Sequence, residues 1–190
     1  MRRLIKAACL LALLIAPFAA SAAGSMPSGP CRLIDPSTCP NTGELVHAQG
    51  FVQALGHFAE GMKVGYFKAD RTLSEQAASA LTGQSANVVV LDGKRYLFSG
   101  CPSHDCRGNA AAVVLNEYGQ IEALGISSFH CGAQCDDVRH LDFYIKTDAQ
   151  DDTVVAALKA WGTSDNIRNG LFHPEADDGI AARTDVHLIP

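Results

Sequence analysis

Apolar side chains recur every three or four residues in three segments of the chain, a spacing that predicts three amphipathic helices. These segments are residues 44–62, 73–81 and 148–161. Before the second segment, Thr72 and Glu75 stand three residues apart, which is the spacing of a capping box that begins a helix. The apolar residues that we assign to buried helix faces are Phe51, Val52, Leu55, Phe58, Met62, Val154, Val155, Leu158 and Trp161.

Five short, mainly apolar runs between the second and third helices predict β-strands. The tripeptide Asp92-Gly93-Lys94 separates the first two runs and is a strong hairpin signal. Because the five strands follow one another closely, we expect an antiparallel sheet of about five strands with flanking helices, which is the α+β class. The runs are residues 87–91, 95–99, 110–115, 121–129 and 138–146.

The first 22 residues have the pattern of a secretory signal peptide. A basic start is followed by an apolar run over residues 7–16, and Ala20-Ser21-Ala22 supplies small residues for cleavage. The run is shorter than the roughly 20 apolar residues that a membrane-spanning helix needs. We therefore expect an exported, periplasmic protein with no membrane partner after cleavage.

Two further segments flank the predicted domain of residues 44–161. Residues 23–43 contain four prolines, which disfavour helix and interior strand, and we interpret them as a proline-rich leader. Residues 162–190 are polar and glycine-rich, and we interpret them as a C-terminal tail.

Composition and charge exclude several classes of protein and of binding partner. The 190 residues are 47% hydrophobic and 18% charged, which suits one compact domain and excludes a disordered chain or a large multidomain enzyme. The net charge of −5 becomes −8 when the three basic residues of the signal peptide are lost. An acidic chain argues against binding to nucleic acid and favours a cationic partner.

Six of the seven cysteines lie outside the signal peptide and form three close couples in the sequence. An exported chain oxidises its thiols, so disulfides are expected. Of the 15 possible pairings we favour neighbours: Cys31–Cys39, Cys101–Cys106 and Cys131–Cys135. Disulfide-bonded cysteines have no free thiolate, which disfavours a Cys-His nucleophile.

The most informative segment is the loop Cys101-Pro102-Ser103-His104-Asp105-Cys106 between two predicted strands. A disulfide that closes so small a ring contributes only about 2 kcal/mol by the chain-entropy estimate. Its better rationale is rigidity, since a loop fixed before binding avoids the cost of ordering its side chains. The loop would present His104 and Asp105, although Asp105 is also the type of residue that merely caps a turn.

Other histidines offer weaker interpretations. His104, His130 and His140 lie near cysteines, but their spacing matches no common four-ligand zinc pattern, so we expect no metal and no cofactor. An enzyme, hydrolytic or metal-dependent, that uses one of these three remains the rival class. We assign no role to His47, His57, His173 and His187.

The loop and its context resemble the bacterial inhibitor of vertebrate lysozyme (Ivy) family. The resemblance spans roughly residues 44–161 and rests on the C-x-x-H-D-C loop, a preceding amphipathic helix, and the strand containing Leu141-Asp142-Phe143 before a helix. It implies that the protein is not an enzyme and that the loop plugs the active-site cleft of a c-type lysozyme, with His104 meeting the catalytic carboxylates. In the family a proline usually directly precedes the histidine, a place that Ser103 holds here. The alternative target is therefore an endogenous lytic transglycosylase or another glycan-cleaving enzyme.

Overall fold

The computed structural model describes residues 29–92 and 94–190. The predicted signal peptide, the start of the leader and the central residue of the predicted 92–94 turn lie outside these ranges. Within them, no helix has the length and apolarity that crossing a membrane requires.

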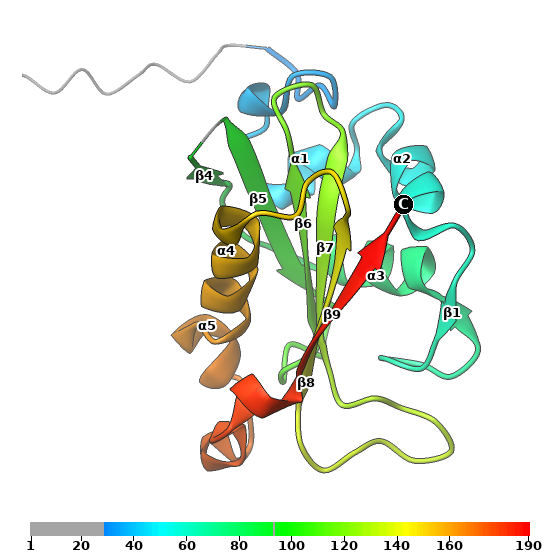
Figure 1. Ribbon diagram of the computed structural model, residues 1–190, viewed down its shortest axis with the longest axis vertical. Helices are drawn as coiled ribbons and strands as arrows, with labels where there is room; N and C mark the ends of the chain where they lie inside the picture. The colour runs from blue at the N-terminus through cyan, green and yellow to red at the C-terminus, as the bar shows by residue number, and fades with distance from the viewer. Residues whose placement is uncertain (1–28, 93) are drawn as a thin grey trace, which may run out of the picture.

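The fold is mixed α+β, built on a mostly antiparallel sheet, which confirms the predicted class (Figure 1). The strand order is β3-β5-β6-β7-β8-β9, and β4 also pairs with β5. Among the described strands, only β8 and β9 run parallel to each other. The strands are β3 Gln84–Ser85, β4 Val89–Leu91, β5 Arg95–Cys101, β6 Ala110–Leu115, β7 Ile121–Ser128, β8 His140–Lys146 and β9 Thr184–Ile189; β1 Lys63–Val64 and β2 Arg71–Thr72 form a separate ribbon.

The expected number of about five strands is wrong, because this sheet has seven. The five predicted runs correspond to β4, β5, β6, β7 and β8. The sixth strand, β3, has two residues and carries no readable pattern. The seventh, β9, belongs to the segment interpreted as a polar tail, and it pairs with β8 along its whole length.

The helices are α1 Thr42–Val46, α2 Phe51–Ala59, α3 Leu73–Leu81, α4 Asp152–Gly162 and α5 Asp165–Arg168, with 3₁₀ turns η1 Pro36–Thr38, η2 Pro174–Asp177 and η3 Ile180–Arg183. The predicted capping box is present, since Thr72 Oγ1 accepts from the backbone N–H of Glu75 and the Glu75 carboxylate accepts from that of Thr72. The single helix predicted over residues 44–62 is two helices. Gly50 divides them with φ +90°, a backbone conformation that favours glycine.

The sheet is covered on both faces, with α1, α2 and α3 on one side and α4 on the other (Figure 1). Alternation along each strand supplies both cores. In β6, for example, Val113 packs with Leu55 and Leu81 of the first core, whereas Val114 packs with Val154 and Leu158 of α4. Because both faces of the central strands are buried, their sequences are nearly continuous apolar runs.

The described residues form three disulfides: Cys31–Cys39, Cys101–Cys106 and Cys131–Cys135. These are the neighbour pairs favoured by the sequence. Disulfides fit an exported protein, extracellular or periplasmic. Two of them close loops at the same end of the sheet, in the β5–β6 and β7–β8 connections. The β7–β8 connection extends well beyond the strands (Figure 1).

Candidate functional site

The Cys101–Cys106 loop begins where β5 ends and returns to the start of β6. Its base rests against the end of α3 at Gly83. A Cβ atom at Gly83 would lie 2.1 Å from the Cys101 carbonyl oxygen and 2.6 Å from the Ser103 backbone nitrogen. Only glycine allows this approach, so the helix end and the disulfide fix the loop from two sides.

His104 occupies the exposed apex of this loop. Its φ of +67° lies in the left-handed region, which is uncommon for a residue with a side chain. The turn is closed by the Asp105 backbone N–H, which donates to the Pro102 carbonyl oxygen at 3.0 Å. Among the described residues, no hydrogen bond or ion pair engages the His104 imidazole. Both ring nitrogens are therefore open to a partner.

Asp105 is exposed beside His104, and its carboxylate accepts a hydrogen bond from Asn109 Nδ2 at 2.8 Å. The bond joins the loop to the residue directly before β6. The alternative role considered from the sequence, a carboxylate that caps backbone N–H groups, would require different donors. Asp105 here accepts from a side-chain amide and keeps a face in solvent.

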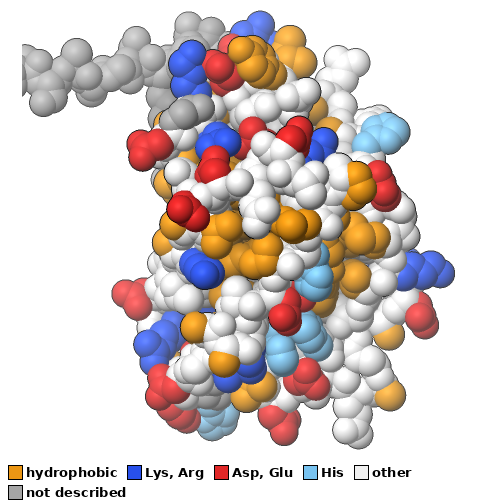
Figure 2. Space-filling model, viewed as in Figure 1, with side chains coloured by type: hydrophobic (Ala, Val, Ile, Leu, Met, Phe, Trp, Pro, Cys, Tyr) orange, Lys and Arg blue, Asp and Glu red, His pale blue; other side chains and the backbone are white. Residues whose placement is uncertain are grey.

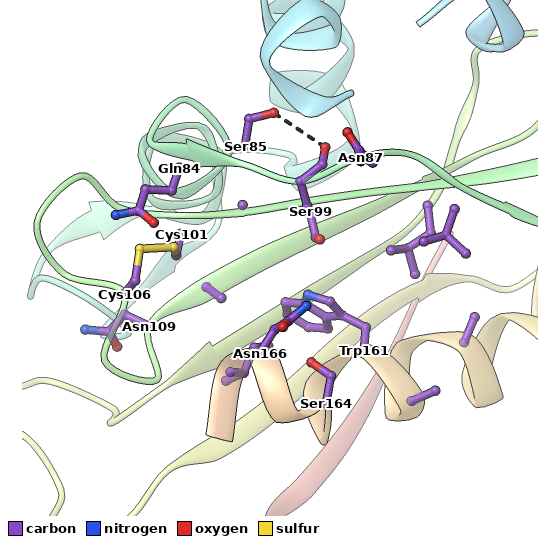
Figure 3. Close-up of a pocket in the computed structure, with 18 of the residues that line it drawn as sticks. Gln84, Ser85, Asn87, Ser99, Cys101, Cys106, Asn109, Trp161, Ser164 and Asn166 are labelled. Atoms are coloured by element: carbon purple, nitrogen blue, oxygen red, sulfur yellow. Dashed lines mark hydrogen bonds between the residues drawn. A yellow bond between two sulfur atoms is a disulfide. The ribbon is translucent and has the colours of Figure 1, made fainter. Parts of the chain in front are cut away.

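Residues of the loop contribute to the walls of two hollows. The larger, a groove of about 830 Å³, runs between the sheet edge and the α4–α5 region (Figure 3). Figure 3 shows the Cys101–Cys106 disulfide at its margin, with Trp161 and Asn166 on the opposite wall. The smaller hollow, about 290 Å³, includes Asp105 and Arg107. The guanidinium of Arg107 lies 4.5 Å above the centre of the Phe172 ring. The loop thus borders two depressions.

The structure separates the three histidines that the sequence grouped as possible zinc ligands. His130 and His140 stack with ring centres 4.1 Å apart at the base of the β7–β8 connection, and His104 is not part of this cluster. Asp142 lies behind them, and its buried carboxylate accepts from His130 Nε2 at 2.7 Å and from His187 Nε2 at 3.1 Å.

Sequence reasoning missed Asp142 and His187. A signal for Asp142 was present, because His140, Asp142 and Tyr144 alternate along β8 and so share one face of an otherwise apolar strand. No signal pointed to His187, since its segment was interpreted as a tail. Its position became apparent only through the parallel pairing that sets His187 beside Tyr144.

The environment shifts several pKa values in this histidine cluster. Burial, followed by the neighbouring His130, lowers the pKa of His140. Burial raises the pKa of Tyr66, and its hydrogen bond with Tyr144 at 2.5 Å and the Asp142 carboxylate raise it further. Burial also raises the pKa of Tyr144. These groups stay neutral at neutral pH and form a polar layer against the first core.

No protein-family model, curated protein or solved structure matches this chain.

Proposed function

We propose that this protein is an exported inhibitor that inserts the Cys101–Cys106 loop into the active-site cleft of a c-type lysozyme. One observation carries the proposal: His104 is exposed, without a polar partner, at the apex of a covalently closed loop. A histidine that served only the fold would be engaged by neighbouring groups. The backbone of His104 is held by the closed loop, and its side chain is exposed and available to a partner.

The chemistry of the target favours an imidazole. Lysozyme cleaves glycan with two carboxyl groups that flank the scissile bond. A protonated histidine has two N–H donors and can form charge-assisted hydrogen bonds to both groups, and their negative charge favours its protonated form. Inhibition then requires no chemistry from the inhibitor.

The surroundings of the loop support insertion. Because the loop borders two hollows, the rim of a partner's cleft has room beside it. The disulfide and the contact at Gly83 hold the loop before binding. A preformed loop avoids about 0.5 to 1.5 kcal/mol of ordering cost for each side chain immobilised. The acidic chain would also attract a basic lysozyme and speed their encounter.

The test is an inhibition assay with the oxidised chain that begins after Ala22. Lysis of cell walls by a c-type lysozyme is measured beside the activity of a lytic transglycosylase, the alternative target. We expect stoichiometric inhibition of lysozyme by the wild-type chain and by His57→Ala, a control at an exposed histidine on α2. If only the transglycosylase is inhibited, the target is that enzyme instead of lysozyme, and the proposal that the loop inserts into an active site still stands. Inhibition of neither enzyme would overturn the proposal.

A further inference from the structure

A second group of side chains, independent of the Cys101–Cys106 loop, has the composition of a metal site. His130, Asp136 and His140 each offer one ligand atom, and these three atoms all lie within 4.8 Å of one another. Two imidazoles and one carboxylate form a ligand set typical of a three-residue zinc site. Figure 2 shows histidine side chains gathered with acidic ones along β9, on the face in view.

The backbone brings these ligands together, although His130 and Asp136 lie six positions apart in the sequence. The Cys131–Cys135 disulfide closes the turn between His130 and Asp136. The Asp136 backbone N–H donates to the Phe129 carbonyl oxygen at 2.7 Å, which returns the chain to the end of β7. His140 then begins β8, where it pairs with Ser128. The Cys131–Cys135 disulfide and the pairing of β7 with β8 therefore fix the backbone of all three ligands.

Asp142 supplies the support that metal-binding histidines usually have. Such a histidine commonly donates its second ring N–H to a carboxylate, which orients the ring and increases its basicity. His130 Nε2 makes this bond to Asp142 at 2.7 Å. A neutral His130 that donates through Nε2 has its lone pair on Nδ1, which is the form that a metal requires. Asp142 is itself held by His187 and is buried, so its position is fixed.

The charges of the neighbourhood suit a cation. Two carboxylates, those of Asp136 and Asp142, contribute negative charge near His140. Arg183 of η3 contributes positive charge there. The Nε2 atom of His140 lies 3.2 Å from a carboxylate oxygen of Asp136.

We propose that His130, Asp136 and His140 bind one Zn²⁺ ion, with the fourth position open to water or to a group of a partner. Tetrahedral coordination sets the ligand atoms about 3.3 Å apart. Ring rotation must therefore draw in atoms that now lie up to 4.8 Å apart and must separate the two stacked imidazoles. The ion would fasten the β7–β8 connection to the sheet beside the Cys101–Cys106 loop.

The test is calorimetric titration of ZnCl₂ into the chelator-treated, oxidised chain without a histidine tag. We expect one saturable site per chain, and at least tenfold weaker binding in His130→Ala, His140→Ala and Asp136→Asn. Asp142→Asn should weaken binding by about 10- to 100-fold, as expected for a supporting carboxylate. His57→Ala and His104→Ala are the matched controls and should bind as the wild type does, which separates this site from the proposed inhibitory one.

Thermal unfolding shows whether each variant folds, and an NMR titration of the wild-type chain requires no variant at all. In that titration the side-chain signals of His130 and His140 should shift with Zn²⁺, whereas those of His57 and His104 should not. Absence of saturable binding by the wild-type chain, or undiminished affinity in folded His140→Ala, would overturn the proposal. So would a shift confined to other histidines.

Discussion

The guanidinium of Arg139 donates to both carboxylate oxygens of Asp177, although 38 residues separate them in the sequence. Both side chains are buried. Arg139 also donates to Ser127 Oγ at 2.9 Å and to the Gly162 carbonyl oxygen at 2.7 Å. Ser127 in turn donates to the Gly108 carbonyl oxygen, just after the Cys101–Cys106 loop. One buried network thus joins η2 of the C-terminal segment, strand β7, the end of α4 and the base of the loop.

Arg139→Ala should lower the free energy of unfolding by about 3 to 5 kcal/mol, because it leaves the Asp177 carboxylate buried without its partner. Arg168→Ala is the matched control, since it breaks an arginine–aspartate pair with Asp178 that is largely exposed. Exposed pairs contribute about 0 to 1 kcal/mol. Chemical denaturation of both variants checks the difference, and an equal loss in the two would show that the Arg139 network does not anchor the C-terminal segment.

Replacing Cys101 and Cys106 together with serine should weaken lysozyme inhibition more than it weakens the fold. The ring is small, so its loss costs only about 2 kcal/mol of stability. Without the disulfide the loop must become ordered when it binds, and this cost weakens binding directly. Inhibition constants and melting temperatures are compared with those of Cys131→Ser/Cys135→Ser, which opens the neighbouring loop. A folded Cys101→Ser/Cys106→Ser protein that inhibits at full strength would contradict the role of rigidity.

The stability of the protein should fall as the pH drops below about 6.5, in part because of His140. Burial and the neighbouring His130 lower its pKa in the folded state, whereas Asp136 and Asp142 oppose the shift and Arg183 adds to it. The unfolded chain therefore binds the proton more readily. The stabilising contribution is complete above the unfolded pKa and is lost as the pH falls through the folded pKa.

The measurement is denaturant unfolding from about pH 8 to about pH 5 in the presence of a chelator, for the wild type and His140→Gln. Glutamine is polar and does not titrate, so the variant should lose less stability across this range. A pH profile identical to that of the wild type would show that His140 does not contribute.

Thr72→Ala should lower the free energy of unfolding by about 1 kcal/mol, because it removes the capping oxygen at the start of α3. Thr72→Ser keeps that oxygen and should retain most of the stability. Denaturation curves of the two variants test the cap, and equal stability of alanine and serine would argue against it.

Local patterns were sufficient for the elements whose determinants are local. The Thr72/Glu75 spacing located α3, and five apolar runs located β4 to β8. The prediction was wrong around Gly50, because it continued one helix through this residue, whereas α1 ends at Val46 and Gly50 directly precedes α2. Periodicity located most of the buried face, although Val52, which was assigned to that face, is exposed. It did not show where one helix ends and the next begins.

Long-range pairing escaped the sequence altogether. β9 contains only exposed and half-buried residues without regular alternation, and its pairing with β8 makes it a strand. The anchor at Asp177 depends on Arg139, which was not singled out. For the candidate loop, its ends, its disulfide and its two polar residues were readable. The two hollows depend on segments that the fold brings together.

The most direct test of the account compares the inhibition constant of His104→Ala with that of the wild-type chain against a c-type lysozyme. Loss of one partner from a desolvated, hydrogen-bonded charge pair costs about 2 to 5 kcal/mol, which corresponds to tens to thousands of fold in affinity. We predict that the inhibition constant rises at least tenfold while the melting temperature stays unchanged, because His104 makes no polar contact within the described chain. An unchanged inhibition constant in the folded variant would contradict the central claim.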